Sequence, residues 1–238
     1  FPTMAKCKLC SRSGIFMTVS RYGLCSSCNS LFVMDVKRRG KIIQESLAII
    51  KDTKNIKVGI SRYDLIIEQV RALVEYEVKG IQVMERSPRE NLQMLIRERD
   101  QVIYEFLEKE YDSVALKARM AATTTAKINA FSKLILLLKE YLDKCTDKSK
   151  VIALLNKAAE ELSAINLDKF VSDAEKAELK GNKRKALDSY YEAYYFLTHD
   201  SVDDSLQTRA IDKIKKKIVA LGGTLQVEGA LNGGKTSL

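Results

Sequence analysis

Two pairs of cysteines near the N-terminus constrain this chain more than any other feature of its sequence. Cys7 and Cys10 form one C-x-x-C pair, Cys25 and Cys28 form a second, and 14 residues separate the pairs. Each pair fits a tight turn with both sulfurs directed at one ion, and four thiolates complete the tetrahedron that zinc prefers. The spacing therefore predicts a structural zinc site, and zinc would supply much of the folding free energy of so small a module.

Other uses of these cysteines compete with zinc. Two disulfides or a redox function fit the same spacing, but the N-terminus shows no secretory signal, and a reducing compartment favours metal. Catalytic zinc needs an open coordination position, which four thiolates do not leave. The one histidine, His199, is distant in sequence and is expected in a loop or at a helix cap. The fifth cysteine, Cys145, is expected to be a buried or unreactive thiol.

The residues between the two pairs favour a β-hairpin. Gly14 and Gly23 flank the apolar run 15–19, which is predicted to be a strand followed by a turn, and the second pair leads into a helix. This order of knuckle, hairpin, knuckle and helix resembles a treble-clef or LIM-like zinc module, as in uncharacterised bacterial and phage proteins. Some proteins of that kind carry an added nuclease domain. No such domain is recognisable in this sequence, so the resemblance implies no nuclease activity.

After Cys28 the sequence predicts helices, because apolar residues recur at spacings of three and four. The clearest helix start is Ser87-Pro-Arg-Glu90, where Ser87 caps the helix and Pro88 fits its first position. Further capping signals are Ser61 with Asp64, Ser201 with Asp204, and the final stop Gly222-Gly223. Helices are expected at 29–53, 62–79, 88–118, 121–144, 149–164, 168–180, 183–198 and 203–221.

Residues 167–198 resemble a tetratricopeptide repeat. Gly181-Asn182 would be the turn between two helices, and alanines occupy the small positions that let the helices approach closely. These small residues are Ala174, Ala186 and Ala193, with Phe170 and Tyr190 at aromatic positions. A three-helix bundle of the microtubule-interaction-and-transport type has a similar pattern. The expected fold class is an all-α body, a helical bundle with a tetratricopeptide-like hairpin, preceded by a small zinc-binding β-hairpin module.

The expected organisation has five parts. Residues 1–3 look like a cloning remnant, 4–60 form the zinc module with its basic helix, and 61–145 form a bundle of long helices. Residues 146–223 form the tetratricopeptide-like region, and 224–238 form a flexible tail rich in glycine and polar residues.

Two parts of the helical body are candidates for binding another protein. Tyr191 and Tyr195 align on one helix face and could line a peptide groove, although aromatic residues at helical spacing usually pack in a core. The long helices within 88–144 could pack internally or form a homodimer. We therefore expect a protein partner or a second copy of the chain.

The positive charge is concentrated at the N-terminal end. The chain has 40 basic and 31 acidic residues, a net charge of +9, and residues 1–60 alone hold eleven basic and three acidic ones. Four thiolates with one Zn²⁺ would reduce that +8 to about +6. The cations expected to bind nucleic acid or an acidic protein are Arg12, Arg21, Lys37, Arg38, Arg39 and Lys41. A solvated helix face without a specific partner would show the same pattern.

Several other functions are disfavoured. No apolar run approaches the roughly 20 residues that cross a bilayer, so we expect no membrane contact and a cytoplasmic location. Residues 229–236 match the literal phosphate-loop pattern, but no helix can follow them in this sequence, so we expect no nucleotide binding. No nucleophile with a base is recognisable. The sequence thus predicts a non-enzymatic, zinc-containing adaptor or scaffold, with a nucleic-acid-binding accessory or regulatory factor as the alternative.

Overall fold

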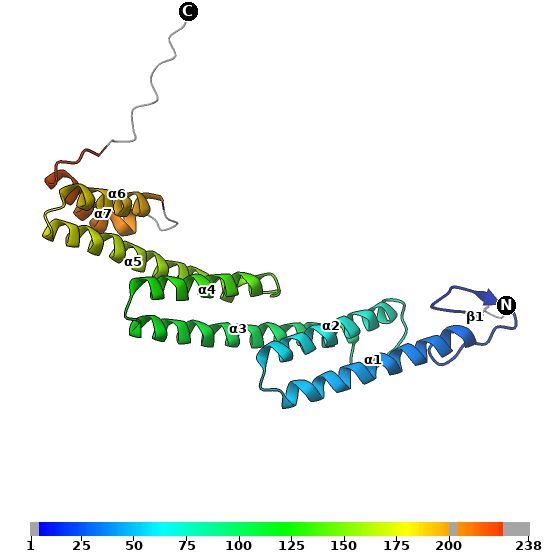
Figure 1. Ribbon diagram of the computed structural model, residues 1–238. Helices are drawn as coiled ribbons and strands as arrows, with labels where there is room; N and C mark the ends of the chain where they lie inside the picture. The colour runs from blue at the N-terminus through cyan, green and yellow to red at the C-terminus, as the bar shows by residue number, and fades with distance from the viewer. Residues whose placement is uncertain (1–4, 200–203, 226–238) are drawn as a thin grey trace, which may run out of the picture. The chain divides into compact units, whose positions relative to one another are not determined.

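The computed structural model describes residues 5–199 and 204–225, and its described part is an all-α body with a small β-hairpin at the N-terminus (Figure 1). The expected fold class is therefore confirmed. Two short strands pair antiparallel: β1 (Ala5–Lys6) and β2 (Ser13–Gly14). The helices are α1 (Ser26–Asp52), α2 (Ile56–Val78), α3 (Pro88–Met120), α4 (Thr124–Leu142), α5 (Ser149–Leu179), α6 (Lys183–His199) and α7 (Asp204–Ala220).

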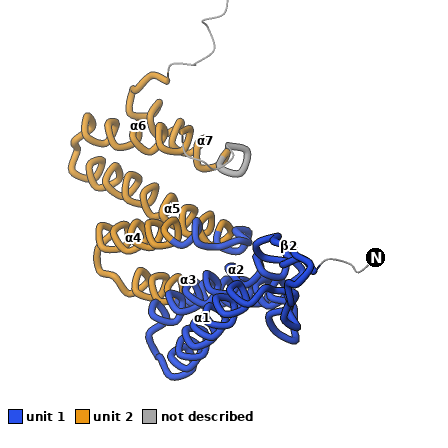
Figure 2. The backbone as a smooth tube through the Cα atoms, turned by 90° about the vertical axis from the view of Figure 1, so that its right-hand side faces the viewer, with its two compact units in different colours: residues 1–109, 141–151 blue, residues 110–140, 152–238 orange. Residues whose placement is uncertain are grey.

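The chain forms two compact units (Figure 2). The first unit contains residues 1–109 and 141–151, and the second contains 110–140 and 152–238. Helices α3, α4 and α5 each contribute to both units, so the units cross the boundaries expected near residues 60 and 145.

In the first unit α1 and α2 form an antiparallel hairpin that packs on the beginning of α3. Ile66, Ile67 and Val70 of α2 are buried together with Leu95 of α3, as the apolar spacing requires. Beside this apolar cluster Arg99 of α3 binds the carboxylates of Asp64 and Asp100. Asp100 also accepts hydrogen bonds from the backbone at 146 and 147, which fixes the loop between α4 and α5.

In the second unit α6 and α7 pack against the C-terminal half of α5. The predicted small residues Ala174, Ala186 and Ala193 have no exposed surface, and Tyr190 is 1% exposed. Alanines at these positions leave no side-chain bulk between neighbouring helices, so the helices can approach closely. The predicted turn at Gly181-Asn182 is present and joins α5 to α6.

Three predictions of local structure are wrong. Residues 15–19 form no strand but a turn at 15–16 followed by irregular backbone, because the hairpin pairs Ala5 and Lys6 with Gly14 and Ser13. The break expected between 164 and 168 is absent, since that segment contains neither glycine nor proline and α5 continues through it. Ser61 lies inside α2, whose actual cap is Asn55, which accepts hydrogen bonds from two backbone amides.

The start predicted at Ser87 is confirmed. Its hydroxyl accepts the amide hydrogen bond of Glu90, and Pro88 is the first residue of α3. The final helix, α7, ends at Ala220, and the amides of Gly222 and Gly223 close it by donating to the carbonyls of Val219 and Ile218, as the predicted glycine stop requires. Ser201, the tail from residue 226 and the phosphate-loop-like segment lie outside the described residues. No described helix is long and apolar enough to cross a membrane.

Gly181 ends α5 with a left-handed backbone, at φ +70°. The amides of Gly181 and Asn182 donate to the carbonyls of Glu178 and Ala177, the pattern that closes a helix at a glycine. A Cβ at Gly181 would meet no atom within 4 Å, so only the backbone resists substitution. Gly181→Ala is therefore expected to lower the free energy of unfolding by about 1 to 2 kcal/mol.

Gly40→Ala is the matched control in urea unfolding. Gly40 also has nothing within 4 Å of an added Cβ, but it lies inside α1. Alanine there should stabilise by about 0.5 to 1 kcal/mol. If both substitutions changed the free energy of unfolding in the same direction, the left-handed backbone of Gly181 would not be the cause of its effect.

Candidate metal centre

The four predicted cysteines lie in one cluster, brought together by two different turns. Cys7 and Cys10 belong to the turn after β1, where the Ser11 amide donates to the Cys7 carbonyl and Ser11 has a positive φ of 61°. Cys25 is the N-cap of α1, and Cys28 lies in its first turn. A backbone hydrogen bond from Lys8 to the carbonyl of Gly23 joins the two turns.

The sulfur geometry fits one tetrahedral ion. The four Sγ atoms lie within 4.8 Å of one another, and those of Cys10 and Cys25 are 3.8 Å apart. A tetrahedral ion with metal–sulfur bonds of about 2.3 Å holds its sulfurs about 3.8 Å apart. A disulfide would bring two sulfurs to about 2.0 Å. All four cysteines are free thiols, so the cluster could hold a metal ion.

The pKa values of the cysteine thiols differ within the cluster. Backbone amides of Cys10 and Cys25 hydrogen-bond to the Cys7 sulfur and lower its pKa to about 6, although burial opposes this. Hydrogen bonds between the Cys28 thiol and the sulfurs of Cys25 and Cys10 favour its protonated form and raise its pKa to about 12, and burial adds to this. A cation bound among the four sulfurs would favour the thiolate form instead. The N-terminus of α1 adds a favourable dipole beside Cys25 and Cys28.

The cysteine module is joined to the helices by an apolar cluster. Cys7, Leu24, Phe32 and Ile81 are all buried in it. The Phe32 ring lies 5.0 Å from the ring of Tyr22 in the module and 5.0 Å from that of Tyr76 in α2. The candidate metal centre is therefore packed against α1, α2 and the loop that follows α2.

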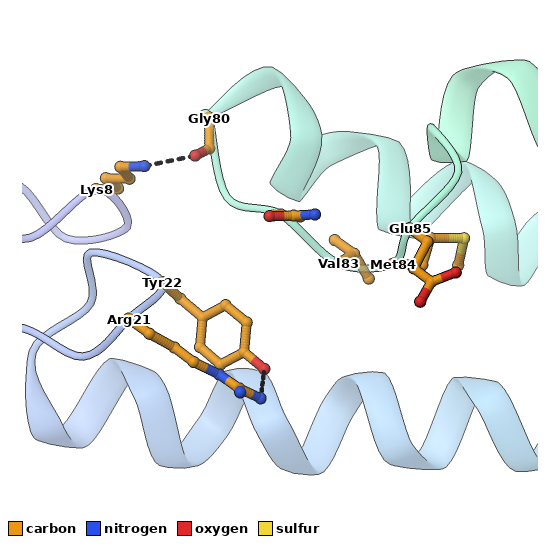
Figure 3. A pocket seen from close by; sticks show the side chains of 8 residues that line it. Lys8, Arg21, Tyr22, Gly80, Val83, Met84 and Glu85 are labelled. Carbon is orange, nitrogen blue, oxygen red and sulfur yellow. Dashed lines mark hydrogen bonds between the residues drawn. The ribbon is translucent and has the colours of Figure 1, made fainter.

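A polar contact fastens the module to the end of α2 (Figure 3). The Lys8 amine donates to the carbonyl of Gly80 at 2.6 Å. Gly80 has a φ of +68°, and the amides of Gly80 and Ile81 donate to the carbonyls of Glu77 and Tyr76. This arrangement ends α2 and turns Ile81 back into the apolar cluster.

A cavity of about 640 Å³ lies between the module and this loop (Figure 3). Lys8 and Arg21 line it from the module, and residues 80 and 82–85 line it from the loop. The Arg21 guanidinium donates to the Tyr22 hydroxyl and lies 4.8 Å from the centre of the Tyr22 ring. The sequence prediction missed the loop wall, whose only signal was the glycine after the apolar pattern of α2.

The six predicted basic site residues have different environments. Arg12, Arg21 and Lys37 are exposed. Arg38 and Arg39 both bind the carboxylate of Asp35, at 3.0 and 2.8 Å, and Lys41 lies 3.8 Å from Glu45.

Arg39 is directed into the protein, not outward. Its side chain is 19% exposed and also donates to the side-chain oxygen of Gln69 in α2. Burial alone would raise the pKa of Asp35, but hydrogen bonds from Arg39, Arg38 and Tyr76 outweigh it and hold that pKa below its usual value. Arg39 and Asp35 thus serve the α1–α2 contact.

The two predicted tyrosines of α6 have separate surroundings. The Tyr191 hydroxyl donates to the backbone carbonyl of Thr224 and accepts from its amide. Tyr195 is 64% exposed, and its ring stacks on that of His199, the last residue of α6. Cys145 is 5% exposed, and burial raises its pKa to about 11, as expected of a buried thiol.

Comparison with family models, curated proteins and solved structures gives no match.

Proposed function

We propose that this chain is a non-enzymatic adaptor whose N-terminal module is held by a structural zinc ion and binds an acidic, partly apolar segment of another protein. The observation that carries the proposal is the cavity beside the module, with Lys8, Arg21 and Tyr22 on one wall and a loop wall that is partly apolar, at Val83 and Met84, and partly polar, at Gln82 and Glu85. The treble-clef-like order of the module and the tetratricopeptide-like hairpin of α5 and α6 agree with a scaffold role.

The donor set favours zinc in a structural role. Four thiolates in a tetrahedron suit zinc or iron, and zinc is the common ion of closed four-cysteine sites. Four protein ligands leave no position for a water or a substrate. Cys7 is also buried in the apolar cluster that joins the module to α1 and α2. Metal binding and packing of the module would therefore stabilise the same part of the structure.

The surface near the metal centre suits a protein partner. Val83 and Met84 give the loop wall of the cavity an apolar part beside Gln82 and Glu85, while Lys8 and Arg21 supply positive charge from the module. Outside the cavity, Leu31 and Met34 of α1 are exposed at 67% and 66%. The exposed Lys37 follows Met34 by three residues, so the two side chains are neighbours on α1. Acidic and apolar side chains of a partner would complement both surfaces.

Nucleic-acid binding by the module is the weaker candidate. Six cations carried that prediction, and three of them, Arg38, Arg39 and Lys41, are near carboxylates of α1. Neutralised cations offer less to phosphates than free ones. The geometry also favours the module over Tyr191 as the protein-binding surface, because the Tyr191 hydroxyl is already paired with the backbone of Thr224.

The decisive experiment captures partners from nuclease-treated lysate of the native cell with three baits. These are the unchanged chain, Arg21→Glu in the cavity, and Arg12→Glu, an exposed cation outside the cavity lining. A partner that binds through the cavity should lose about 2 kcal/mol or more of binding free energy with Arg21→Glu, because the reversed charge repels its carboxylates. Arg12→Glu should retain capture.

The purified partner is then titrated against the same three chains. Equal binding by Arg21→Glu and the unchanged chain would reject the cavity as the site. The capture is repeated with untreated lysate. A partner that is captured from untreated lysate but not from nuclease-treated lysate would instead favour the nucleic-acid alternative. Sedimentation of the chain alone at several concentrations separates self-association from binding of another protein.

A further inference from the structure

The nearly neutral total charge of the helical body hides a strongly basic end in the second unit. The α5–α6 turn and the C-terminal half of α7 lie side by side there, because Lys217 of α7 binds Glu178 of α5 at 2.9 Å. A Cβ on Gly222, just after α7, would lie 3.5 Å from the amine of Lys183. Six exposed cations from these two segments form what we call the basic end: Lys180, Lys183, Arg184, Lys185, Lys213 and Lys216.

These cations are free to bind a partner. Within residues 5–199 and 204–225, none of the six forms an ion pair with a carboxylate. In the described part of these segments the exposed carboxylates are Glu175, Asp188 and Asp212, and Asp168 of α5 lines one cavity together with Glu175 and Lys213. The predicted cluster on α1 differs, since Arg38, Arg39 and Lys41 each have an acidic neighbour. Among the described residues, the basic end thus gathers six cations without an ion-pair partner, whereas three of the six cations predicted at the N-terminal end have one.

From this arrangement we propose that the basic end binds the phosphate backbone of a nucleic acid without reading its sequence. Free lysine and arginine side chains around one end of a bundle can follow successive phosphates of a strand, and the release of counterions drives such binding. In the described part of the chain no large aromatic side chain is exposed among the six cations, so base stacking contributes little.

An anionic membrane is the less suitable polyanion. Helices that bind a bilayer surface present a continuous apolar face to it. The apolar face of α7 consists of Ile211, Ile214 and Ile218, and all three are buried against α5 and α6. At this end only Leu179 and Val219 are large, apolar and exposed, and they belong to different helices.

The test measures binding of a fluorescently labelled DNA duplex and a labelled single-stranded RNA to the full chain, at about 50 and 200 mM salt. The variant Lys183→Glu/Arg184→Glu/Lys185→Glu changes the basic end. Its matched control, Lys37→Glu/Arg38→Glu/Lys41→Glu, changes the charge of α1 by the same amount. Lys213→Glu/Lys216→Glu is a second variant of the basic end, on another helix, and circular dichroism verifies that all variants fold.

The unchanged chain should bind at low salt and lose affinity steeply at high salt. The triple variant of the basic end should bind at least about tenfold more weakly, with a salt slope reduced by about 3, one for each lost phosphate contact. The affinity and the salt slope of the α1 control should be closer to those of the unchanged chain.

Three results would overturn the proposal: no binding at low salt, an equal or greater loss in the α1 control, or binding of phosphatidylserine vesicles without binding of nucleic acid. These results are independent of partner capture through Arg21, so this proposal and the proposed adaptor function can fail separately.

Discussion

Cys25→Ser is expected to abolish metal binding and to unfold the N-terminal module, while Cys145→Ser leaves both intact. Cys25 supplies one of the four clustered sulfurs and is the N-cap of α1, so its loss opens the tetrahedron. Structural zinc contributes about 10 to 16 kcal/mol in small zinc-finger peptides, far more than a marginal module can lose. Metal content should fall from one ion per chain toward zero.

The measurement combines elemental analysis of the purified protein with thermal unfolding. Cys145→Ser is the matched control, because it removes a buried thiol that lies outside the cluster. It should keep one ion per chain. Retention of the ion and of full stability by Cys25→Ser would refute the structural role. Iron in place of zinc would refute the assignment of the metal while leaving the role of the cysteines unchanged.

Phe32→Ala is expected to separate the module from the helices even when the metal is bound. The Phe32 side chain is 2% exposed and lies between Tyr22 of the module and Tyr76 of α2. Truncation of a buried phenylalanine removes its contacts and leaves a cavity, at a cost of about 3 to 5 kcal/mol. Urea unfolding of the metal-loaded chain should show this loss.

Leu31→Ala is the control for Phe32→Ala at the adjacent position. Leu31 is 67% exposed, so its truncation should change the free energy of unfolding by no more than about 0.5 kcal/mol. Similar losses for the two variants would contradict the packing of the module against α2. Because Leu31 lies on the proposed partner surface, Leu31→Ala should weaken partner binding without this loss of stability.

Local sequence signals predicted most of the fold. Cysteine spacing identified the cluster, Ser87 with Pro88 identified the start of α3, and Gly181 identified the turn after α5. Each of these signals involves residues that are close together in the sequence, so the local backbone structure follows from the residue types alone. The false break between 164 and 168 came from polar residues that a helix tolerates when neighbouring turns support it.

Contacts between distant segments were beyond sequence reasoning. Arg39 looked like a surface cation, but its partner Gln69 lies 30 residues away and becomes a neighbour only when α2 folds back on α1. The cavity wall beyond Gly80 depends on a contact with Lys8, 72 residues earlier. Summing charge over the body likewise hid the basic end, since Lys183 and Lys216 belong to different helices.

The hydrogen bond from Lys8 to Gly80 gives the proposed adaptor an order of assembly. Lys8 follows directly after Cys7, so the position of its amine depends on a formed cysteine cluster. The loop from Gly80 forms one wall of the cavity, and Lys8 forms part of the other. If the ion is structural, as proposed, the complete cavity exists only after the metal has bound. Metal supply would then precede and limit partner capture in the cell.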